Sequence, residues 1–277
     1  MTQGPTAPVQ QGQYVKANGL NIYYEDNGTG EPLLLLHGGT VNLQMWEHSR
    51  AAFAEQFRVI ALDSRGHGRT NNPAGTLSYR LMADDVAALV QALELQKPLI
   101  FGFSDGGQIA LEIGIHYPEL AKALVLAGTM IRFTPEYRTW LRAMVGDEQS
   151  PEVDTEQFAR DHPDWAAFLQ QIHGPDAWKT LLHQIKPMWA SPLSFNYTPD
   201  DFAHVAAPTL VLVGDRDDFV SVEQSVELYR LLPHAELAVI PGADHGAIVS
   251  AKTDFIQPLV LDFLLRHRAQ ADQATTM

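Results

Sequence analysis

The chain has 277 residues and a mass of 30.7 kDa, which suits one large α/β domain or a core domain with an insertion. Its formal net charge of −14, from 33 acidic and 19 basic side chains, argues against nucleic acid or an anionic membrane as a partner. Because the chain has no cysteine, disulfides, thiolate nucleophiles and cysteine metal sites are excluded, and we expect a reducing, cytoplasmic location.

The two ends of the chain carry little structural signal. Residues 1–13 lack a basic start and an apolar stretch, so we expect a flexible leader and no secretory signal. Residues 269–277 are expected to form a disordered tail. Neither end has an apolar run long enough to cross a membrane. We therefore expect a soluble monomer or homodimer.

Short apolar runs alternate with amphipathic segments through the rest of the chain. The runs are nearly continuous in apolar residues, as in strands buried on both faces, and the alternation predicts a mostly parallel sheet covered by helices. The first run is the exception, since Ala17-Asn18-Gly19 predicts a turn into an antiparallel hairpin. Apolar spacing predicts helices over 79–95, 105–117 and 253–268. The expected strands are 20–24, 32–36, 58–62, 99–101, 123–127, 209–213 and 237–240.

The composition changes in residues 131–204. The strand signal disappears there, prolines interrupt helix-length stretches, and four of the five tryptophans occur. We interpret this segment as a helical cap inserted into a core made of residues 14–130 and 205–268. We expect some of its aromatic side chains to line a pocket under the cap.

One short motif predicts a nucleophile. Ser104 lies in Gly102-Phe103-Ser104-Asp105-Gly106, between an expected strand and an expected helix. A strand that turns sharply into a helix lifts one side chain outwards at a strained backbone angle, and side chains two positions to either side would collide. The two glycines remove those side chains. The turn also directs the first N–H groups of the helix at whatever the serine attacks.

Two later loops supply an acid and a base. Acyl transfer by serine needs a histidine as base and a carboxylate that orients it. The loop 214–220 contains Asp215, Asp217 and Asp218, and the loop 241–247 contains His245. Both loops follow strands, as Ser104 does, and the carboxyl ends of parallel strands meet at one edge of a sheet. We therefore expect these groups to meet.

This order of nucleophile, acid and histidine on alternating strands and loops resembles the α/β-hydrolase superfamily, in its capped serine esterase form, over roughly residues 14–266. The runs His37-Gly38-Gly39-Thr40 and 63–70 add to the resemblance. It implies an eight-stranded, mostly parallel sheet flanked by helices. It also selects Asp217, three residues after the glycine that ends its strand. The alternative acid position of some members reads Gly128-Thr129-Met130 here and has no carboxylate.

The resemblance implies further site residues. The backbone N–H groups of Asp105 and Gly39 would form the oxyanion hole, with Thr40 beside Gly39. The remaining histidines lack a matching acid and nucleophile, and no spacing among them indicates zinc. We therefore expect no metal and no cofactor. The residues expected to bind substrate are Thr40, Phe103, Trp140, Trp189 and Val220.

Asp105 is unusual beside a forming oxyanion. An acid in the first turn of a helix interacts favourably with the helix dipole, by about 0.3–1 kcal/mol. The second interpretation is that its carboxylate faces the pocket. The run from Gly102 to Gly107 resembles the elbow of the valacyclovir-hydrolase-like branch, which implies substrates with a positive amino group near the scissile carbonyl.

We predict a serine esterase that acts on small or medium carboxylic esters. Lactonase, carbon–carbon-bond hydrolase and metal-free perhydrolase activities use the same triad and stay open as alternatives. An aspartate nucleophile, as in epoxide hydrolases or dehalogenases of this fold, is disfavoured because residue 104 is serine. A ligand-binding protein with slow turnover is the alternative outside the enzymes.

Overall fold

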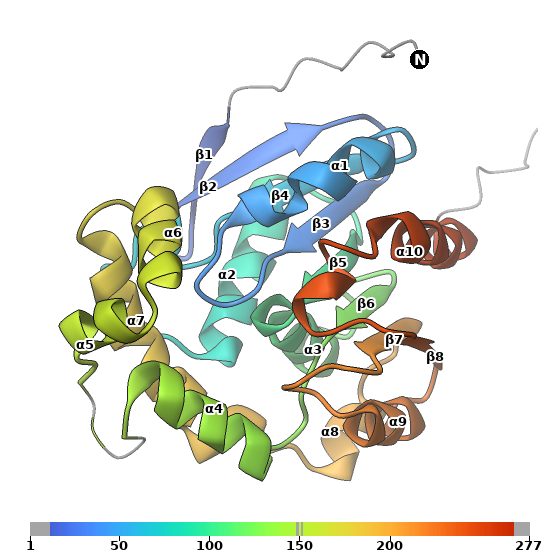
Figure 1. Ribbon diagram of the computed structural model, residues 1–277. Helices are drawn as coiled ribbons and strands as arrows, with labels where there is room; N and C mark the ends of the chain where they lie inside the picture. Colours follow the sequence, from blue (N-terminus) through green and yellow to red (C-terminus); the bar gives the residue numbers. More distant parts are fainter. Residues whose placement is uncertain (1–11, 148–149, 151, 269–277) are drawn as a thin grey trace, which may run out of the picture.

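The computed structural model describes residues 12–147, 150 and 152–268, and it contains an eight-stranded sheet (Figure 1). The strand order is β1-β2-β4-β3-β5-β6-β7-β8, and neighbours from β4 to β8 are parallel. The predicted fold class is thereby confirmed. The strands are β1 (Gln13–Ala17), β2 (Leu20–Asn27), β3 (Pro32–Leu36), β4 (Arg58–Leu62), β5 (Leu99–Phe103), β6 (Leu124–Ala127), β7 (Thr209–Gly214) and β8 (Ala235–Ile240).

The first two strands form the predicted antiparallel hairpin. Ala17 pairs with Leu20 across a two-residue turn in which Asn18 and Gly19 have φ of 45° and 75°, the positive φ angles that such turns require. β2 extends to Asn27, beyond the expected end, because its second half pairs with β4. The expected leader lies outside the described residues except for its last part, where Gln13 already belongs to β1. The expected tail lies outside them altogether.

The central strands are apolar on both faces because helices cover both faces. Leu33 and Leu35 of β3 belong to the core that also contains residues of α1 (Glu47–Ala54) and α10 (Thr253–His267), whereas Leu34 and Leu36 belong to the core with α2 (Tyr79–Ala92), α3 (Asp105–His116) and α9 (Val222–Leu231). Figure 1 shows α1 and α10 on the near face of the sheet and α2 behind it. A run of leucines therefore forms a strand here, since alternate side chains enter two different cores.

The helix predicted to reach residue 95 ends earlier. Its start is set by Ser78, whose side chain accepts a hydrogen bond from the N–H of Leu81. Its last residue is Ala92, because Leu93 leaves the helical conformation and Glu94 has φ of 52°. The helix after Ser104 covers Asp105 to His116, close to the predicted range.

Five helices and a short 3₁₀ turn connect β6 to β7, in the segment interpreted from the sequence as a cap. Several prolines that interrupt the sequence pattern begin these helices: Pro135, Pro163 and Pro199 occupy first helical positions, where a missing N–H breaks no hydrogen bond. The helices are α4 (Pro135–Val145), α5 (Thr155–Asp161), α6 (Pro163–His173), α7 (Ala177–Ala190) and α8 (Pro199–Ala203), with the 3₁₀ turn at Pro192–Phe195.

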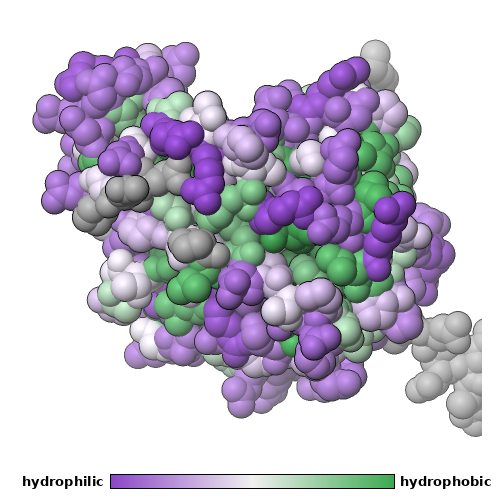
Figure 2. Space-filling model, turned by 90° about the horizontal axis from the view of Figure 1, so that it is seen from below, coloured by the Kyte–Doolittle hydropathy of each residue, from purple (hydrophilic) through white to green (hydrophobic). Residues whose placement is uncertain are grey.

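The surface is mostly hydrophilic on the face seen from below, with apolar areas between the charged and polar residues (Figure 2). Charged side chains favour the surface of folded proteins, and this chain has 33 acidic and 19 basic ones. Among the helices that the structure describes, none has both the length and the apolar character needed to cross a lipid bilayer.

Candidate active site

Ser104 occupies the sharp turn between β5 and α3. Its φ of 53° and ψ of −118° lie outside the regions favoured by residues with a side chain. A Cβ atom on Gly102 would lie 2.1 Å from the carbonyl oxygen of Gly106, and a Cβ atom on Gly106 would lie 2.1 Å from that of Leu36. Both glycines are therefore required by the close approach of backbone to backbone, as predicted for a strained elbow.

Three side chains from distant parts of the chain form a hydrogen-bonded series. Ser104 Oγ lies 3.0 Å from His245 Nε2, and His245 Nδ1 lies 2.8 Å from Asp217 Oδ2. The Asp217 side chain is fully buried and that of His245 is 15% exposed. With Nδ1–H donating to the carboxylate, Nε2 is free to accept the serine proton, which is the arrangement a serine nucleophile needs.

The environment of Asp217 distinguishes it from the other two acids in its loop. Its Oδ1 accepts hydrogen bonds from the N–H groups of Phe219 and Val220, at 2.9 and 2.8 Å, which fixes the carboxylate towards His245. Asp215 instead accepts from the N–H of Gly242, and Asp218 is exposed. The geometry thus places the Asp217 carboxylate, and neither of the other two, beside His245, and its role as the acid stays a prediction.

Gly39 and Thr40 lie in the loop after β3, at the rim of the same cavity as Ser104. The N–H of Thr40 donates to His67 Nε2 at 3.3 Å, and its carbonyl accepts from His173 Nε2 at 2.8 Å. Thr40 has φ of 58°, so this loop is held in an unusual conformation by two histidine rings. The orientation of Gly39, the predicted oxyanion donor, depends on that loop.

His37, His67 and His173 pack together beside this loop, and the role of His173 was missed from the sequence. His173, at the end of α6, also accepts a hydrogen bond from the N–H of Gly68 at 2.9 Å. It therefore links the helical segment to the loops after β3 and β4. Burial lowers the pKa of all three histidines, most strongly for His67, so the neutral rings that these hydrogen bonds need are favoured.

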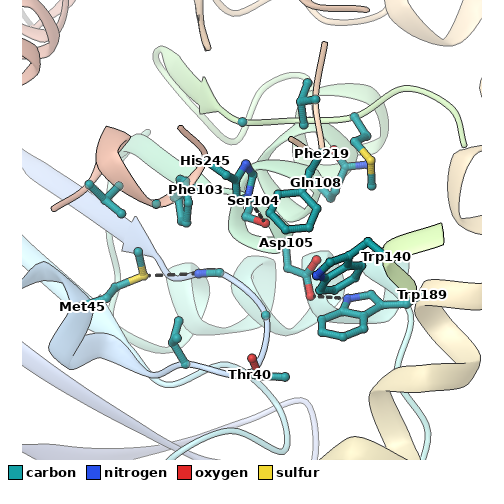
Figure 3. A pocket seen from close by; sticks show the side chains of 18 of the residues that line it. Thr40, Met45, Phe103, Ser104, Asp105, Gln108, Trp140, Trp189, Phe219 and His245 are labelled. Carbon is teal, nitrogen blue, oxygen red and sulfur yellow. Dashed lines mark hydrogen bonds between the residues drawn. The ribbon is translucent and has the colours of Figure 1, made fainter. Parts of the chain in front are cut away.

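The carboxylate of Asp105 is paired inside the protein. Its Oδ1 accepts a hydrogen bond from the Tyr79 hydroxyl at 2.8 Å. Its Oδ2 accepts one from Trp189 Nε1 at 2.9 Å (Figure 3). Burial raises the pKa of this carboxyl to about 6, and the two hydrogen bonds and the nearby His245 oppose that rise. A Cβ atom on Gly39 would lie 2.4 Å from Oδ2. Neither interpretation made from the sequence included this pairing.

A cavity of about 400 Å³ opens beside Ser104 and His245 (Figure 3). All five residues predicted to bind substrate line this cavity, and their role in binding stays a prediction. They are Thr40, Phe103, Trp140, Trp189 and Val220. Gln108 and Phe219 also line it. Both have a sequence signal that was overlooked, because Gln108 lies one helical turn after Ser104 and Phe219 two residues after Asp217. The segment 131–204 contributes Tyr137, Trp140, Trp165 and Trp189 to the lining.

Titratable side chains near the cavity do not form a metal site. Within residues 12–147, 150 and 152–268, no group of three or more His, Cys, Asp or Glu side chains is arranged to hold a metal ion. The polar groups at Ser104 can instead carry out proton transfer and nucleophilic attack in an apolar surrounding.

The family model of the alpha/beta hydrolase family matches residues 33–257. This range is well over half of the chain, so the protein belongs to the α/β-hydrolase family, and the resemblance to the superfamily stated from the motifs is confirmed. Its capped serine esterase form stays a prediction. The likeness of the elbow to the valacyclovir-hydrolase-like branch stays a prediction.

Individual relatives are moderately similar over nearly their full lengths. The 2-hydroxy-6-oxo-2,4-heptadienoate hydrolase of Pseudomonas putida is 28% identical, covering 91% of this chain and 96% of the relative. A thermophilic esterase from Thermogutta terrifontis is 27% identical with a TM-score of 0.70, covering 95% of this chain and 100% of that one. Est816, an N-acyl homoserine lactone degrading enzyme, is 26% identical with a TM-score of 0.72, covering 89% of this chain and 98% of that one. The family supports a hydrolase, and these relatives act on different substrates.

Proposed function

We propose that this protein is a serine hydrolase that cleaves carboxylic esters through an acyl-enzyme intermediate. The single observation that supports the proposal best is the hydrogen-bonded series from Ser104 Oγ through His245 to Asp217, at 3.0 and 2.8 Å, beside an apolar cavity. A serine hydroxyl becomes a useful nucleophile when a neutral imidazole accepts its proton.

In the proposed mechanism, Ser104 Oγ attacks the ester carbonyl while its proton moves to His245 Nε2. Asp217 stabilises the imidazolium through Nδ1–H. The oxyanion accepts hydrogen bonds from the N–H groups of Asp105 and Gly39, each of which is typically worth about 3–4 kcal/mol in the transition state. His245 then protonates the leaving alkoxide. Water, deprotonated by His245, hydrolyses the acyl-enzyme and restores Ser104.

We further propose that the segment 131–204 covers the site as a cap and that its aromatic side chains bind the apolar part of the substrate. Four of them line the cavity, and Trp140 packs edge-on to Phe219 with ring centroids 4.8 Å apart. An apolar lining of this kind favours acyl groups of small or medium size. The thermophilic esterase among the structural relatives supports an ester as the first substrate class to test.

The experiment is hydrolysis of p-nitrophenyl butyrate together with labelling by a fluorophosphonate. We expect turnover and one labelled residue, Ser104, and we expect Ser104→Ala to lose at least about 10³-fold in kcat. Ser250 is the matched control, because it lines the same cavity but its hydroxyl bonds to the carbonyl of Gly246. Ser250→Ala should keep both properties. Absence of turnover and of labelling at Ser104 in the intact chain would overturn the proposal.

Lactones and carbon–carbon substrates are the second candidates, since relatives act on N-acyl homoserine lactones and on 2-hydroxy-6-oxo-2,4-heptadienoate. The proposed triad serves all of these reactions. A parallel panel with a straight-chain ester, a γ-lactone and a vinylogous diketone separates them by their ratios of kcat/KM. Fluorophosphonate labelling without turnover of any substrate would favour the slow-turnover binding protein.

A further inference from the structure

Gln108 has no function in the mechanism above, yet the residue lines the cavity. The residue is 2% exposed and lines the pocket that contains Ser104. Within the described part of the chain, neither Nε2 nor Oε1 of this amide has a hydrogen-bond partner. An unpaired buried polar atom costs about 1–3 kcal/mol. A glutamine kept in this state in the wall of a pocket points to a partner supplied by the ligand, which the amide would meet by turning towards the cavity.

The polar side chains around Gln108 are already paired. Ser104 and His245 bond to each other, and both carboxylate oxygens of Asp105 accept hydrogen bonds. Most of the other lining residues of this pocket are apolar, aromatic or glycine, among them Met130 and Tyr137. In such a pocket a few polar groups fix the orientation of the ligand. Gln108 therefore adds a polar contact that the nucleophile and its neighbours do not provide.

The position of Gln108 relative to Ser104 sets where on the substrate that contact falls. The N–H of Gln108 donates to the carbonyl oxygen of Ser104 at 3.0 Å, which is the first helical hydrogen bond of α3. One helical turn, about 5.4 Å, thus separates the two residues. Helical side chains also tilt towards the N-terminus, which is the Ser104 end. An extended substrate chain advances about 1.2 Å per bond, so the helical turn of about 5.4 Å corresponds to about four bonds of the substrate. Figure 3 shows Gln108 among the side chains of the pocket.

The chemistry of the amide defines the group it would bind. Nε2–H donates and Oε1 accepts, so the best complement is a group that does both, such as a carboxamide. A charged group is disfavoured, because Gln108 carries no charge to offset its desolvation in an apolar cavity. The last side-chain torsion of glutamine has a broad range of allowed angles, so the amide plane can turn towards a ligand at little cost in free energy.

We propose that Gln108 is a specificity-determining residue that binds a carboxamide in the acyl chain of the substrate, about four bonds from the scissile carbonyl. The acyl side is chosen because the acyl group stays bound to Ser104, at the start of the helix that carries Gln108, through both half-reactions. This inference rests on the proposed esterase function and names its substrate class.

The test compares two matched esters. In p-nitrophenyl 4-acetamidobutanoate the amide nitrogen lies four bonds from the ester carbonyl, and p-nitrophenyl heptanoate has a chain of the same length without it. We expect the wild-type enzyme to prefer the amide ester. We expect Gln108→Met, which keeps the size of the side chain, to lower kcat/KM for the amide ester about tenfold or more and to leave the heptanoate unchanged or faster. Its melting temperature should rise, since two unpaired polar atoms are removed.

Thr129 provides the matched control. It is also 2% exposed and its Oγ1 also has no partner among the described residues, but it is absent from the cavity wall. Thr129→Val should raise stability without changing the ratio of the two esters. Equal changes of both esters in Gln108→Met, or a wild-type preference for heptanoate, would overturn the inference. Hydrolysis of neither ester by wild type would instead refute the proposed function.

If Gln108→Met does not fold, inhibition of the wild-type enzyme decides. The product acids 4-acetamidobutanoate and heptanoate are compared as competitive inhibitors. We expect the amide acid to bind at least as tightly as heptanoate, although its amide group must be desolvated. Weaker binding of the amide acid by tenfold or more would contradict the inference.

Discussion

Replacement of Asp105 by asparagine should stabilise the protein at neutral pH and not at acid pH. Burial raises the pKa of this carboxyl from its ordinary value of 3.8 to about 6. The folded protein therefore binds the proton more tightly than the unfolded chain does. Below pH 3.8 the Asp105 carboxyl is protonated in both the folded and the unfolded state, so it does not lower the free energy of unfolding. Above pH 6 both are ionised, and the ionised form costs about 3 kcal/mol in the fold, at about 1.4 kcal/mol per tenfold change in proton affinity.

Asparagine can keep both hydrogen bonds while removing the charge. Its Oδ1 accepts from Trp189 Nε1 and its Nδ2–H donates to the Tyr79 hydroxyl, which can rotate to accept. We expect Asp105→Asn to gain up to about 3 kcal/mol at pH 8, equivalent to roughly 5–10 °C in melting temperature. The gain should shrink between pH 6 and pH 4, by about 1.4 kcal/mol per pH unit.

The assay is urea unfolding of wild type and variant at pH 4, 5, 6 and 8. Asp218→Asn is the control, because it makes the same change of charge at an exposed position and should stay within about 0.5 kcal/mol of wild type throughout. If the free energy of unfolding differed between wild type and Asp105→Asn by the same amount at pH 4 and pH 8, the reasoning would be refuted. A loss of stability in Asp105→Asn at pH 8 would refute it too, since it would mean that the ionised carboxylate stabilises the fold.

Three other substitutions test the architecture of the site. Gly106→Ala places a Cβ atom 2.1 Å from a backbone carbonyl oxygen of β3 and should lower the free energy of unfolding by about 3 kcal/mol or more, measured by thermal unfolding. At Gly75 a Cβ atom meets no atom within 4 Å, so Gly75→Ala should lower it by only about 1 kcal/mol, because of the positive φ of 69°. His173→Leu removes two hydrogen bonds that hold the loops beside Gly39 and should lower kcat on p-nitrophenyl butyrate about tenfold. His48→Leu, at an exposed position, should leave kcat unchanged. Equal kcat values for the two variants would exclude a positioning role for His173. Burial lowers the pKa of His67 well below 6.5, so below pH 6.5 the unfolded chain binds a proton at this ring more readily than the folded protein does, and stability falls by up to about 1.4 kcal/mol for each unit of pH decrease. Urea titrations of His67→Asn should show a smaller slope, because His37 and His173, whose pKa values burial also lowers, keep their contributions.

Much of the fold was predictable because its signals are local. The hairpin at Asn18-Gly19 follows from two residues that tolerate positive φ. The leucine run of β3 has the composition of a doubly covered strand. The elbow at Ser104 is visible because its glycine pattern spans five residues, although only the clash at Gly102, with the carbonyl of Gly106, is local, and that at Gly106 is with Leu36 of β3. The carboxyl-end rule for parallel strands then brings His245 towards Ser104 without any knowledge of the packing.

The boundaries of elements were less well predicted than their existence. β2 is longer than its apolar run because pairing with β4 extends it. The helix from Tyr79 is shorter than its apolar pattern because Glu94 adopts positive φ. Prolines at 135 and 199 begin helices that the sequence pattern treats only as interruptions. The neighbouring strand decides the first case, and the local backbone decides the other two.

The sequence by itself determined the sheet, the elbow and the types of the reacting groups, since backbone strain and apolar periodicity act over a few residues. Only the tertiary structure decided which aromatic residues of the segment 131–204 line the cavity. It also decided that Asp105 is paired with Trp189, 84 positions away, and with Tyr79, 26 positions away. Such contacts depend on how separate helices pack over the sheet, and the burial that raises the pKa of Asp105 arises from that packing alone.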